Sequence, residues 1–365
     1  MAASSSVAKS STPGSTDIAW STFWGLAAAA LVLLGIYFGS RGLRDFDPAL
    51  VSYAGATVFS AFGLGYRYAM WLRRPPTRMY WRRGWQLFLK PRDLPRNLAR
   101  FIGLIVSTFV AQRFIERRSR LRWAAHFCIS WGCILAALVT FPLSFGWIRF
   151  ETAPNTQQLY QAFVFNIHIL TFHLGTWYAE LLFDILDVAA VMVLAGIFFS
   201  LWRRARDRGA LAVQQFSADL LPLALLFLIC ITGLALTVST HLLRGYHYDF
   251  LSETHAVVVI FTLLYLPFGK FFHIFQRPAQ LSIHYYRETG AAGPQALCVR
   301  CRQPFASAMH VSDLKQVQQQ LQIRYQMQDG AHYQDVCPAC RRKQLALTQD
   351  ALWQAARAHG DVSHG

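Results

Sequence analysis

The chain has 365 residues, of which 54% are hydrophobic and only 15% are charged. Soluble globular proteins carry about 25% charged residues, so the composition excludes an ordinary soluble domain and indicates a membrane protein. The net charge of +16 is high enough for a nucleic-acid-binding protein. The cations, however, stand in short blocks beside long apolar runs, as in membrane-protein loops, so we expect no nucleic-acid partner.

Six apolar runs are long enough to cross the hydrocarbon core of a bilayer, which takes about 20 residues. A Ser-rich tail at 1–16, expected to be disordered, precedes them. A seventh apolar stretch, 101–115, has an uncharged core too short to cross and flanking arginines, so we predict an amphipathic helix in the membrane interface. The predicted fold class is all-α, a polytopic transmembrane helix bundle, with spans at 18–40, 49–72, 123–148, 178–202, 220–243 and 254–275.

The cations predict how these spans are oriented. Segment 73–122 holds fourteen Lys or Arg residues and 203–208 holds four, whereas the loops on the opposite side hold four in all. With six spans, both basic segments and both termini fall on one side. The positive-inside rule places that side in the cytoplasm, so we expect a multi-pass protein of the inner (cytoplasmic) membrane with both termini cytoplasmic.

Four histidines lie within or at the ends of the predicted spans: His126, His241, His255 and His273. Ionisable groups inside a membrane are costly, so they are functional candidates, and three of them are considered first. His255 and His273 stand 18 residues apart. That is about five whole helical turns, so on a continuous helix both leave one face, with one histidine near each membrane surface. His126, in the opening turn of the third span, shares the predicted depth of His273. Imidazole is a good axial ligand for haem iron. The matched depth favours a ligand pair over two separate interfacial histidines.

Three stretches of the chain resemble the gamma, cytochrome b subunit of membrane-bound respiratory nitrate reductases and related anchors of heterodisulfide-reductase-like complexes. In 254–278, two histidines stand at the family's spacing, with Pro-Phe before a basic residue and a proline after the second histidine. Stretch 117–132, with its arginine-rich entry, His126 and Trp-Gly, is similar to the family's first ligand helix. Stretch 219–233, with Thr-Gly, is similar to its penultimate span. The resemblance covers residues 50–287 approximately.

The resemblance implies a transmembrane haem b domain over 17–286. His126 and His273 would ligate a haem on the cytoplasmic side, and His255 would ligate an outer haem. Three basic residues near these histidines are candidates to pair with haem propionates: Lys270, Arg277 and Arg122. The alternative is that these side chains extend to the membrane interface, as cationic side chains near helix ends ordinarily do.

The chain departs from the family at the partner of His255. The family's first ligand helix carries a second histidine about three turns after the first, and here that neighbourhood, 136–138, is Ala-Ala-Leu. On this resemblance the protein would hold one haem, or two with a substitute ligand. His168 and His173 are the favoured substitutes, ahead of His241. They lie in an apolar segment that we interpret as a re-entrant or interfacial helix.

Residues 287–365 are polar and contain two cysteine pairs, which have the spacing of a four-thiolate metal site. Cys298 and Cys301 form one CxxC, and Cys337 and Cys340 form the other. Each CxxC offers two sulfurs to one tetrahedral ion. We predict a small cytoplasmic, zinc-ribbon-like tail that holds zinc, with iron or an iron–sulfur cluster as the alternative. The nitrate reductase resemblance does not extend to it.

The predicted function is electron transfer in a respiratory chain, between the quinone or quinol pool and a soluble redox subunit on the cytoplasmic side. We see no catalytic acid, nucleophile or phosphate loop, so substrate chemistry would belong to the partner. Two alternatives stay open: a transporter or proton channel that uses the intramembrane histidines, and a haemless membrane anchor or redox sensor whose active part is the zinc-binding tail.

Overall fold

The computed structural model describes residues 14–153, 158–207, 209, 212, 214–323, 325–327 and 330–361, the last four by backbone only. The predicted disordered tail falls mainly on residues 1–13, outside the described residues. The chain divides into two compact units. The membrane unit comprises Ser15–Met70 and Arg100–Pro278, and the cysteine unit comprises Trp71–Ala99 and Ala279–Gly365 with the N-terminal residues.

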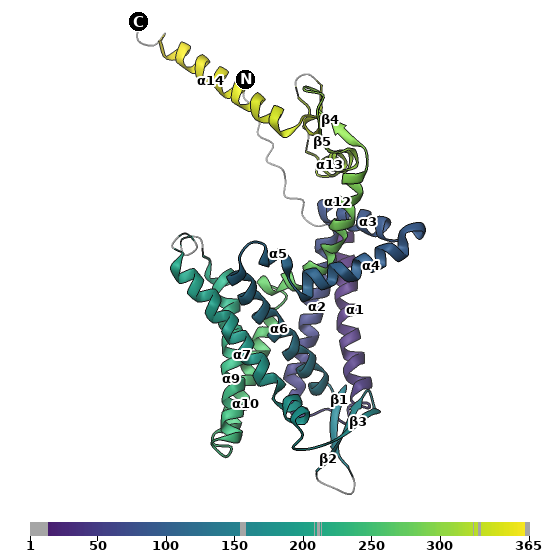
Figure 1. The fold of residues 1–365 in the computed structure, drawn as a ribbon, viewed down its shortest axis with the longest axis vertical. Coiled ribbons are helices and arrows are strands. Elements are labelled where there is room, and N and C mark those ends of the chain that lie inside the picture. The colour runs from purple at the N-terminus through teal and green to yellow at the C-terminus, as the bar shows by residue number, and fades with distance from the viewer. Residues whose placement is uncertain are drawn as a thin grey trace. The chain divides into compact units, whose positions relative to one another are not determined.

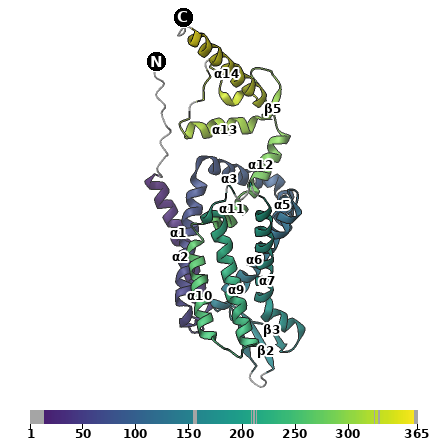
Figure 2. The ribbon, with the colours of Figure 1, turned by 90° about the vertical axis from the view of Figure 1, so that its left-hand side faces the viewer.

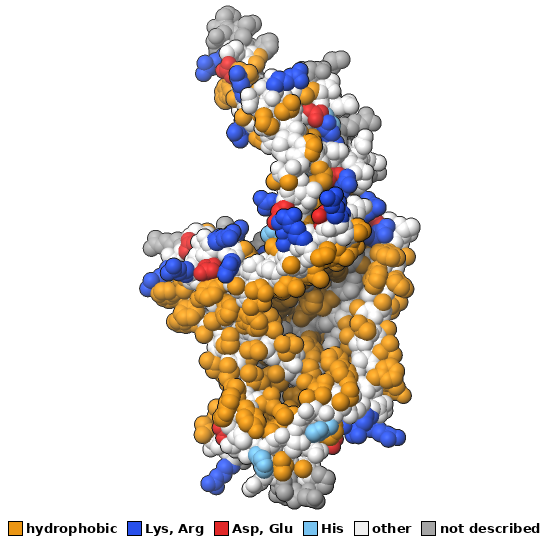
Figure 3. All heavy atoms as spheres, turned by 45° about the vertical axis from the view of Figure 1, so that its right-hand side comes forward, with side chains coloured by type: hydrophobic (Ala, Val, Ile, Leu, Met, Phe, Trp, Pro, Cys, Tyr) orange, Lys and Arg blue, Asp and Glu red, His pale blue; other side chains and the backbone are white. Residues whose placement is uncertain are grey.

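The membrane unit is built from long apolar helices. Among the described residues, five helices are long and apolar enough to cross a membrane, or six if the bent pair α10 and α11 counts as one span. Hydrophobic side chains cover the sides of this bundle (Figure 3), as lipid contact requires. The coarse prediction of a helical membrane protein is confirmed. The long helices are α1 Ser15–Gly39, α2 Val51–Arg73, α6 Arg120–Ser144, α7 Trp177–Arg206, α9 Leu221–His241, α10 Tyr248–Tyr265 and the shorter α11 His273–Ala279.

The prediction of one continuous helix over 254–275 is wrong. α10 ends at Tyr265, and the chain bends by 66° into a 3₁₀ turn, η5 Lys270–Phe272, and α11. Pro267 has no N–H to continue the helix, and the break frees backbone carbonyls. Ser60 and Arg67 of α2 donate hydrogen bonds to two of these carbonyls, those of Leu263 and Pro267. The argument that both histidines of this run share one straight helix face therefore fails.

Helices α6, α7, α9 and α10 pack one against the next in chain order (Figure 1). The α6–α7 contact is close because two glycines lie in it. A Cβ on Gly132 would stand 2.7 Å from the Ala189 carbonyl oxygen, and one on Gly196 would stand 2.6 Å from the Ala125 carbonyl oxygen. Small residues let helix backbones approach closely where lipid offers no hydrophobic driving force.

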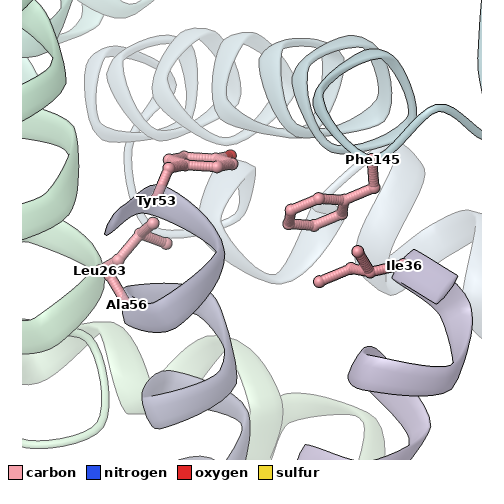
Figure 4. Packing of buried hydrophobic residues seen from close by; sticks show 5 residues of the cluster. All are labelled: Ile36, Tyr53, Ala56, Phe145 and Leu263. Carbon is pink, nitrogen blue, oxygen red and sulfur yellow. The ribbon is translucent and has the colours of Figure 1, made fainter. Parts of the chain in front are cut away.

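A buried apolar cluster joins the first two helices to the rest of the membrane unit. Tyr53 of α2 stacks its ring 5.7 Å from Phe145, which follows the end of α6. Ile36 of α1 and Leu263 of α10 complete the contact with Ala56 (Figure 4). The cluster therefore ties together helices that are more than 200 residues apart in the sequence.

Three strands, not a helix, follow α6. β1 Ile148–Thr152, β2 Leu159–Val164 and β3 Ile167–His173 form an antiparallel sheet in the order β1-β2-β3. The interpretation of this segment as a re-entrant or interfacial helix is wrong. Its β-branched and aromatic residues favour strands, and left-handed Phe165 and Asn166 form the β2–β3 turn.

The segment predicted to lie in the interface forms the amphipathic helix α4 Leu94–Ile105, the π-helical turn η3 Val106–Val110 and the short α5 Arg113–Glu116. It is not among the helices able to cross a membrane. Large apolar side chains recur at every fourth position, and all of them are exposed: Leu94, Leu98, Ile102, Val106 and Val110. Such a stripe is typical of a helix in the interface, and that location stays a prediction.

The cysteine unit contains four described helices and one hairpin. They are α3 Pro75–Phe88, α12 Leu281–Ala292, α13 Ala308–Gln320 and α14 Pro338–Asp361, with β4 Gln295–Leu297 paired to β5 Pro304–Ser307. Asp313 of α13 is 1% exposed. It pairs with Arg83 of α3 at 2.9 Å and accepts the hydroxyl of Tyr286 of α12 at 2.9 Å. Burial and this carboxylate both raise the pKa of the Tyr286 hydroxyl. This buried carboxylate therefore holds three helices together.

Candidate functional site

His126 and His273 come from helices that begin at one end of the membrane unit. His126 lies in the second turn of α6, which Ser119 caps, and His273 is the first residue of α11. Both helices start at the end of the bundle that carries α5 (Figures 1 and 2). His273 and Arg277 both lie within electrostatic range of the His126 imidazole. The fold thus brings together two histidines that are distant in the sequence.

Each of these two imidazoles has its Nδ1 bound to an oxygen. His126 Nδ1 lies 2.8 Å from Oε1 of Gln112. His273 Nδ1 lies 2.5 Å from the carbonyl oxygen of Lys270. A carbonyl oxygen can only accept a hydrogen bond, so His273 carries its proton on Nδ1. Its Nε2 then holds the lone pair that a metal ligand needs.

His255 follows the same pattern between α9 and α10. It lies on α10, and its Nδ1 is 2.8 Å from the hydroxyl oxygen of Thr232 on α9. That hydroxyl donates its own proton to the Leu228 carbonyl at 2.7 Å, so its oxygen accepts from the imidazole. Gly233 leaves room beside the ring, since a Cβ there would meet His255 at 3.4 Å.

The Nε2 atoms of His126, His255 and His273 have no hydrogen-bond partner in the part of the chain that the structure describes. Metal-bound histidines characteristically donate their other ring nitrogen to a carbonyl or similar acceptor, which fixes the tautomer and the ring orientation. All three side chains are half-buried among apolar helices. This donor set fits axial ligation of haem iron.

The proposed substitute ligands of an outer haem lie elsewhere. His168 and His173 are exposed on β3, and His168 has its Nε2 bound to Thr171 at 2.8 Å. His241 is exposed at the end of α9. Among the described residues, none of the three contacts His255 through a hydrogen bond. Their role as its partner stays a prediction.

The three candidate propionate partners have different surroundings. Lys270 is already paired with Asp219 at 2.6 Å, so a propionate would have to share it. The Arg277 guanidinium lies over the ring of Phe114 at 4.9 Å, in the same part of the bundle as His126. Arg122 is exposed. Arg277 is therefore the cation best placed for this role.

The four cysteines of the second unit form one cluster, with all ligand atoms within 4.8 Å of one another. Cys298 and Cys301 lie in the β4–β5 turn, Cys337 precedes α14, and Cys340 lies in its first turn. The Sγ atoms of Cys301 and Cys337 are 3.8 Å apart. Zinc–sulfur bonds of about 2.3 Å in a tetrahedron require roughly this separation. The cluster can hold a metal ion, as its spacing predicts.

The cysteine cluster also provides the local core of its unit. Cys298 and Cys337 are buried with Val336, against Phe305 and Met327. Burial opposes ionisation of Cys298, but backbone N–H groups, including those of Cys301 and Cys337, outweigh it and lower the pKa of the Cys298 thiol to about 6. A thiolate is the form that binds metal.

Sequence reasoning singled out the histidines but not the groups that orient them. Gln112 was only the end of an uncharged stretch, and Thr232 only part of a Thr-Gly pair. In both cases the available signal was a polar residue within an apolar run. The histidine that each polar residue contacts could not be named before the helices were placed.

Comparisons with protein-family models, with curated proteins and with solved structures find no match to this chain. The case for its function therefore depends on the geometry of its own residues.

Proposed function

We propose that this protein is the b-type cytochrome subunit of a membrane electron-transfer complex. One observation carries the proposal: three histidines on apolar helices each have Nδ1 within 2.8 Å of an oxygen atom and, among the described residues, no hydrogen-bond partner at Nε2. A haem bound there supplies reversible one-electron chemistry. His126 and His273 would hold one haem and His255 would contribute to a second.

The protein's own residues supply ligands, orientation and a low-dielectric surrounding for that haem. Electrons would be exchanged with a quinone or quinol in the membrane and with a soluble redox subunit in the cytoplasm. The basic last turn of α7, with Arg203, Arg204 and Arg206, lies at the same end of the bundle as α5 (Figure 1). The positive-inside rule favours the cytoplasm for that end, and hence for the His126–His273 pair. The four cysteines would hold zinc as a structural ion.

A reduced-minus-oxidised visible spectrum of the purified, detergent-solubilised protein tests the proposal. We expect the bands of b-type haem. His126→Ala and His273→Ala should each remove the same spectral component, and His255→Ala should remove a different one. His284→Ala serves as the matched control for loss of an exposed imidazole, because His284 is not a candidate ligand. Among the variants of His168, His173 and His241, the one that removes the His255 component would identify the outer partner. A colourless protein that binds no added haemin would refute the proposal and favour a histidine proton path.

A further inference from the structure

Gln112 is a buried polar residue in a strained backbone conformation. It is 4% exposed and lies between the π-helical turn η3 and α5 with φ at 51°. Residues other than glycine seldom adopt a left-handed conformation, and such strain concentrates at functional positions. A buried amide also needs partners for both its oxygen and its nitrogen. Placing this side chain against α6 therefore costs conformational free energy.

Two indole groups bond to the backbone directly before Gln112. Trp123 donates from Nε1 to the Ala111 carbonyl at 2.8 Å, and Trp131 donates from Nε1 to the Val110 carbonyl at 3.1 Å. Both tryptophans belong to α6, the helix that carries His126. Gln112 is thus anchored to the helix of its histidine partner, which gives the amide a defined position rather than a mobile one.

The hydrogen bonds around Gln112 run in one direction only. Ser130 donates its hydroxyl proton to the Phe127 carbonyl at 3.4 Å, so its oxygen accepts from the Gln112 amide nitrogen. The amide oxygen Oε1 then faces His126 Nδ1 at 2.8 Å. An amide oxygen can only accept, so His126 carries its proton on Nδ1 and its lone pair on Nε2.

We propose that Gln112 is a positioning residue that holds His126 as the Nδ1–H tautomer with Nε2 available to a metal. The consequence for a bound haem rests on the proposed function. A hydrogen-bond acceptor at Nδ1 makes the imidazole a stronger electron donor to a metal bound at Nε2. Gln112 would therefore favour oxidised iron and lower the reduction potential of a haem held by His126. The tautomer itself does not depend on whether haem is present.

The tautomer is measured directly by ¹⁵N solid-state NMR of protein labelled at histidine, with the His126 signal identified by its loss in His126→Ala. We expect a protonated Nδ1 and an unprotonated Nε2 in the parent protein. Gln112→Leu removes the acceptor at similar volume and should shift His126 toward the Nε2–H form. Ser107→Ala is the matched control, because Ser107 lies in the neighbouring π-helical turn η3 and, among the described residues, its hydroxyl bonds only to the Leu104 carbonyl. An Nε2–H His126 in the parent protein would overturn the inference.

A haem titration provides the second readout. Gln112→Leu should weaken binding of the His126 haem by about 10- to 100-fold, the usual cost of losing such a partner. Gln112→Glu keeps an acceptor oxygen and adds negative charge, so it should retain the haem at a lower midpoint potential. The Glu variant keeps the test decisive if Gln112→Leu does not fold. An unchanged midpoint in Gln112→Glu would overturn the positioning role while leaving the b-type spectrum intact. Absence of b-type bands in the parent would instead overturn the proposed function.

Discussion

The histidine site and the cysteine cluster are both sets of ligand atoms, but the chain assembles them differently. His126 and His273 come from separate helices, and each is oriented by a third group, Gln112 or the Lys270 carbonyl. The cysteines come from two CxxC turns, one between β4 and β5 and one at the start of α14, and their ligand atoms lie within 4.8 Å of one another. Local turns fix the second geometry, whereas packing between helices fixes the first.

This difference predicts different sensitivities. A site made by local turns depends on its own ligands and on the ion that joins them. A site made between helices depends on the distance between backbones and on the hydrogen bonds that orient each ring. Changes far from the ligands should therefore disturb the histidine site and spare the cysteine cluster.

The largest effect should come from removing metal from the cysteine cluster. Structural zinc contributes about 10–16 kcal/mol of apparent binding free energy in zinc-finger peptides at neutral pH, far more than this small local core can replace. We expect one zinc per chain by elemental analysis and none in Cys298→Ser with Cys337→Ser. Protease should then cleave between β4 and α14 in this variant, with the b-type spectrum unchanged. Equal protease resistance with and without metal would contradict a structural role.

The next effect should come from the α6–α7 contact. In Gly196→Ala the new methyl would stand 2.6 Å from the Ala125 carbonyl oxygen, one residue before His126. Overpacking of this kind costs about 1–3 kcal/mol, and we expect lower thermal stability in detergent with weaker haem retention. Gly55→Ala is the matched control, since no atom lies within 4 Å of its Cβ. Equal behaviour of the two variants would show that close helix contact does not shape the histidine site.

A loss of similar size should follow Arg83→Ala in the cysteine unit. Asp313 is 1% exposed and would keep only Tyr286 as a partner. Loss of one member of a buried ion pair costs about 3–5 kcal/mol, but Arg83 is 44% exposed, so we expect about 2 kcal/mol. Urea unfolding followed by tryptophan fluorescence measures it, with zinc content unchanged. Arg82→Ala is the control, because the described residues show no ion pair for Arg82. Equal stability of both variants would mean that the buried carboxylate does not need its cation.

The smallest effect should come from Thr232→Val, which keeps side-chain shape and removes the acceptor for His255 Nδ1. A lost hydrogen bond of this type costs about 1 kcal/mol. We expect a shift in the His255 component of the haem spectrum and none in the His126 component. Thr240→Val on the same helix is the control, because in the described part of the chain that hydroxyl bonds only to the Leu236 carbonyl. A shift in both components would show that the two sites are not independent.

Much of the helical framework could be predicted, because hydropathy over about 20 residues is a local property. The four-cysteine site was predictable for a similar reason, since each CxxC places its two sulfurs through one turn. The break at Pro267 was missed. The proline was visible in the sequence. The carbonyls freed at the break, however, accept hydrogen bonds from Ser60 and Arg67. These two residues precede the carbonyls by 203 and 200 residues in the chain. The β1–β3 sheet was missed because apolar, aromatic-rich segments of this length suit a strand or a short helix alike.

The sequence by itself determined that this chain has several apolar helices, a basic side, histidines inside the apolar runs and four cysteines in metal-binding spacing. Only the tertiary structure decided which nitrogen of each histidine is free. That choice depends on Gln112, Thr232 and the Lys270 carbonyl, which reach the rings across helix contacts or a helix break. Hydrogen-bond direction is set by the partner atom, and a partner on another helix has no fixed sequence separation from its histidine.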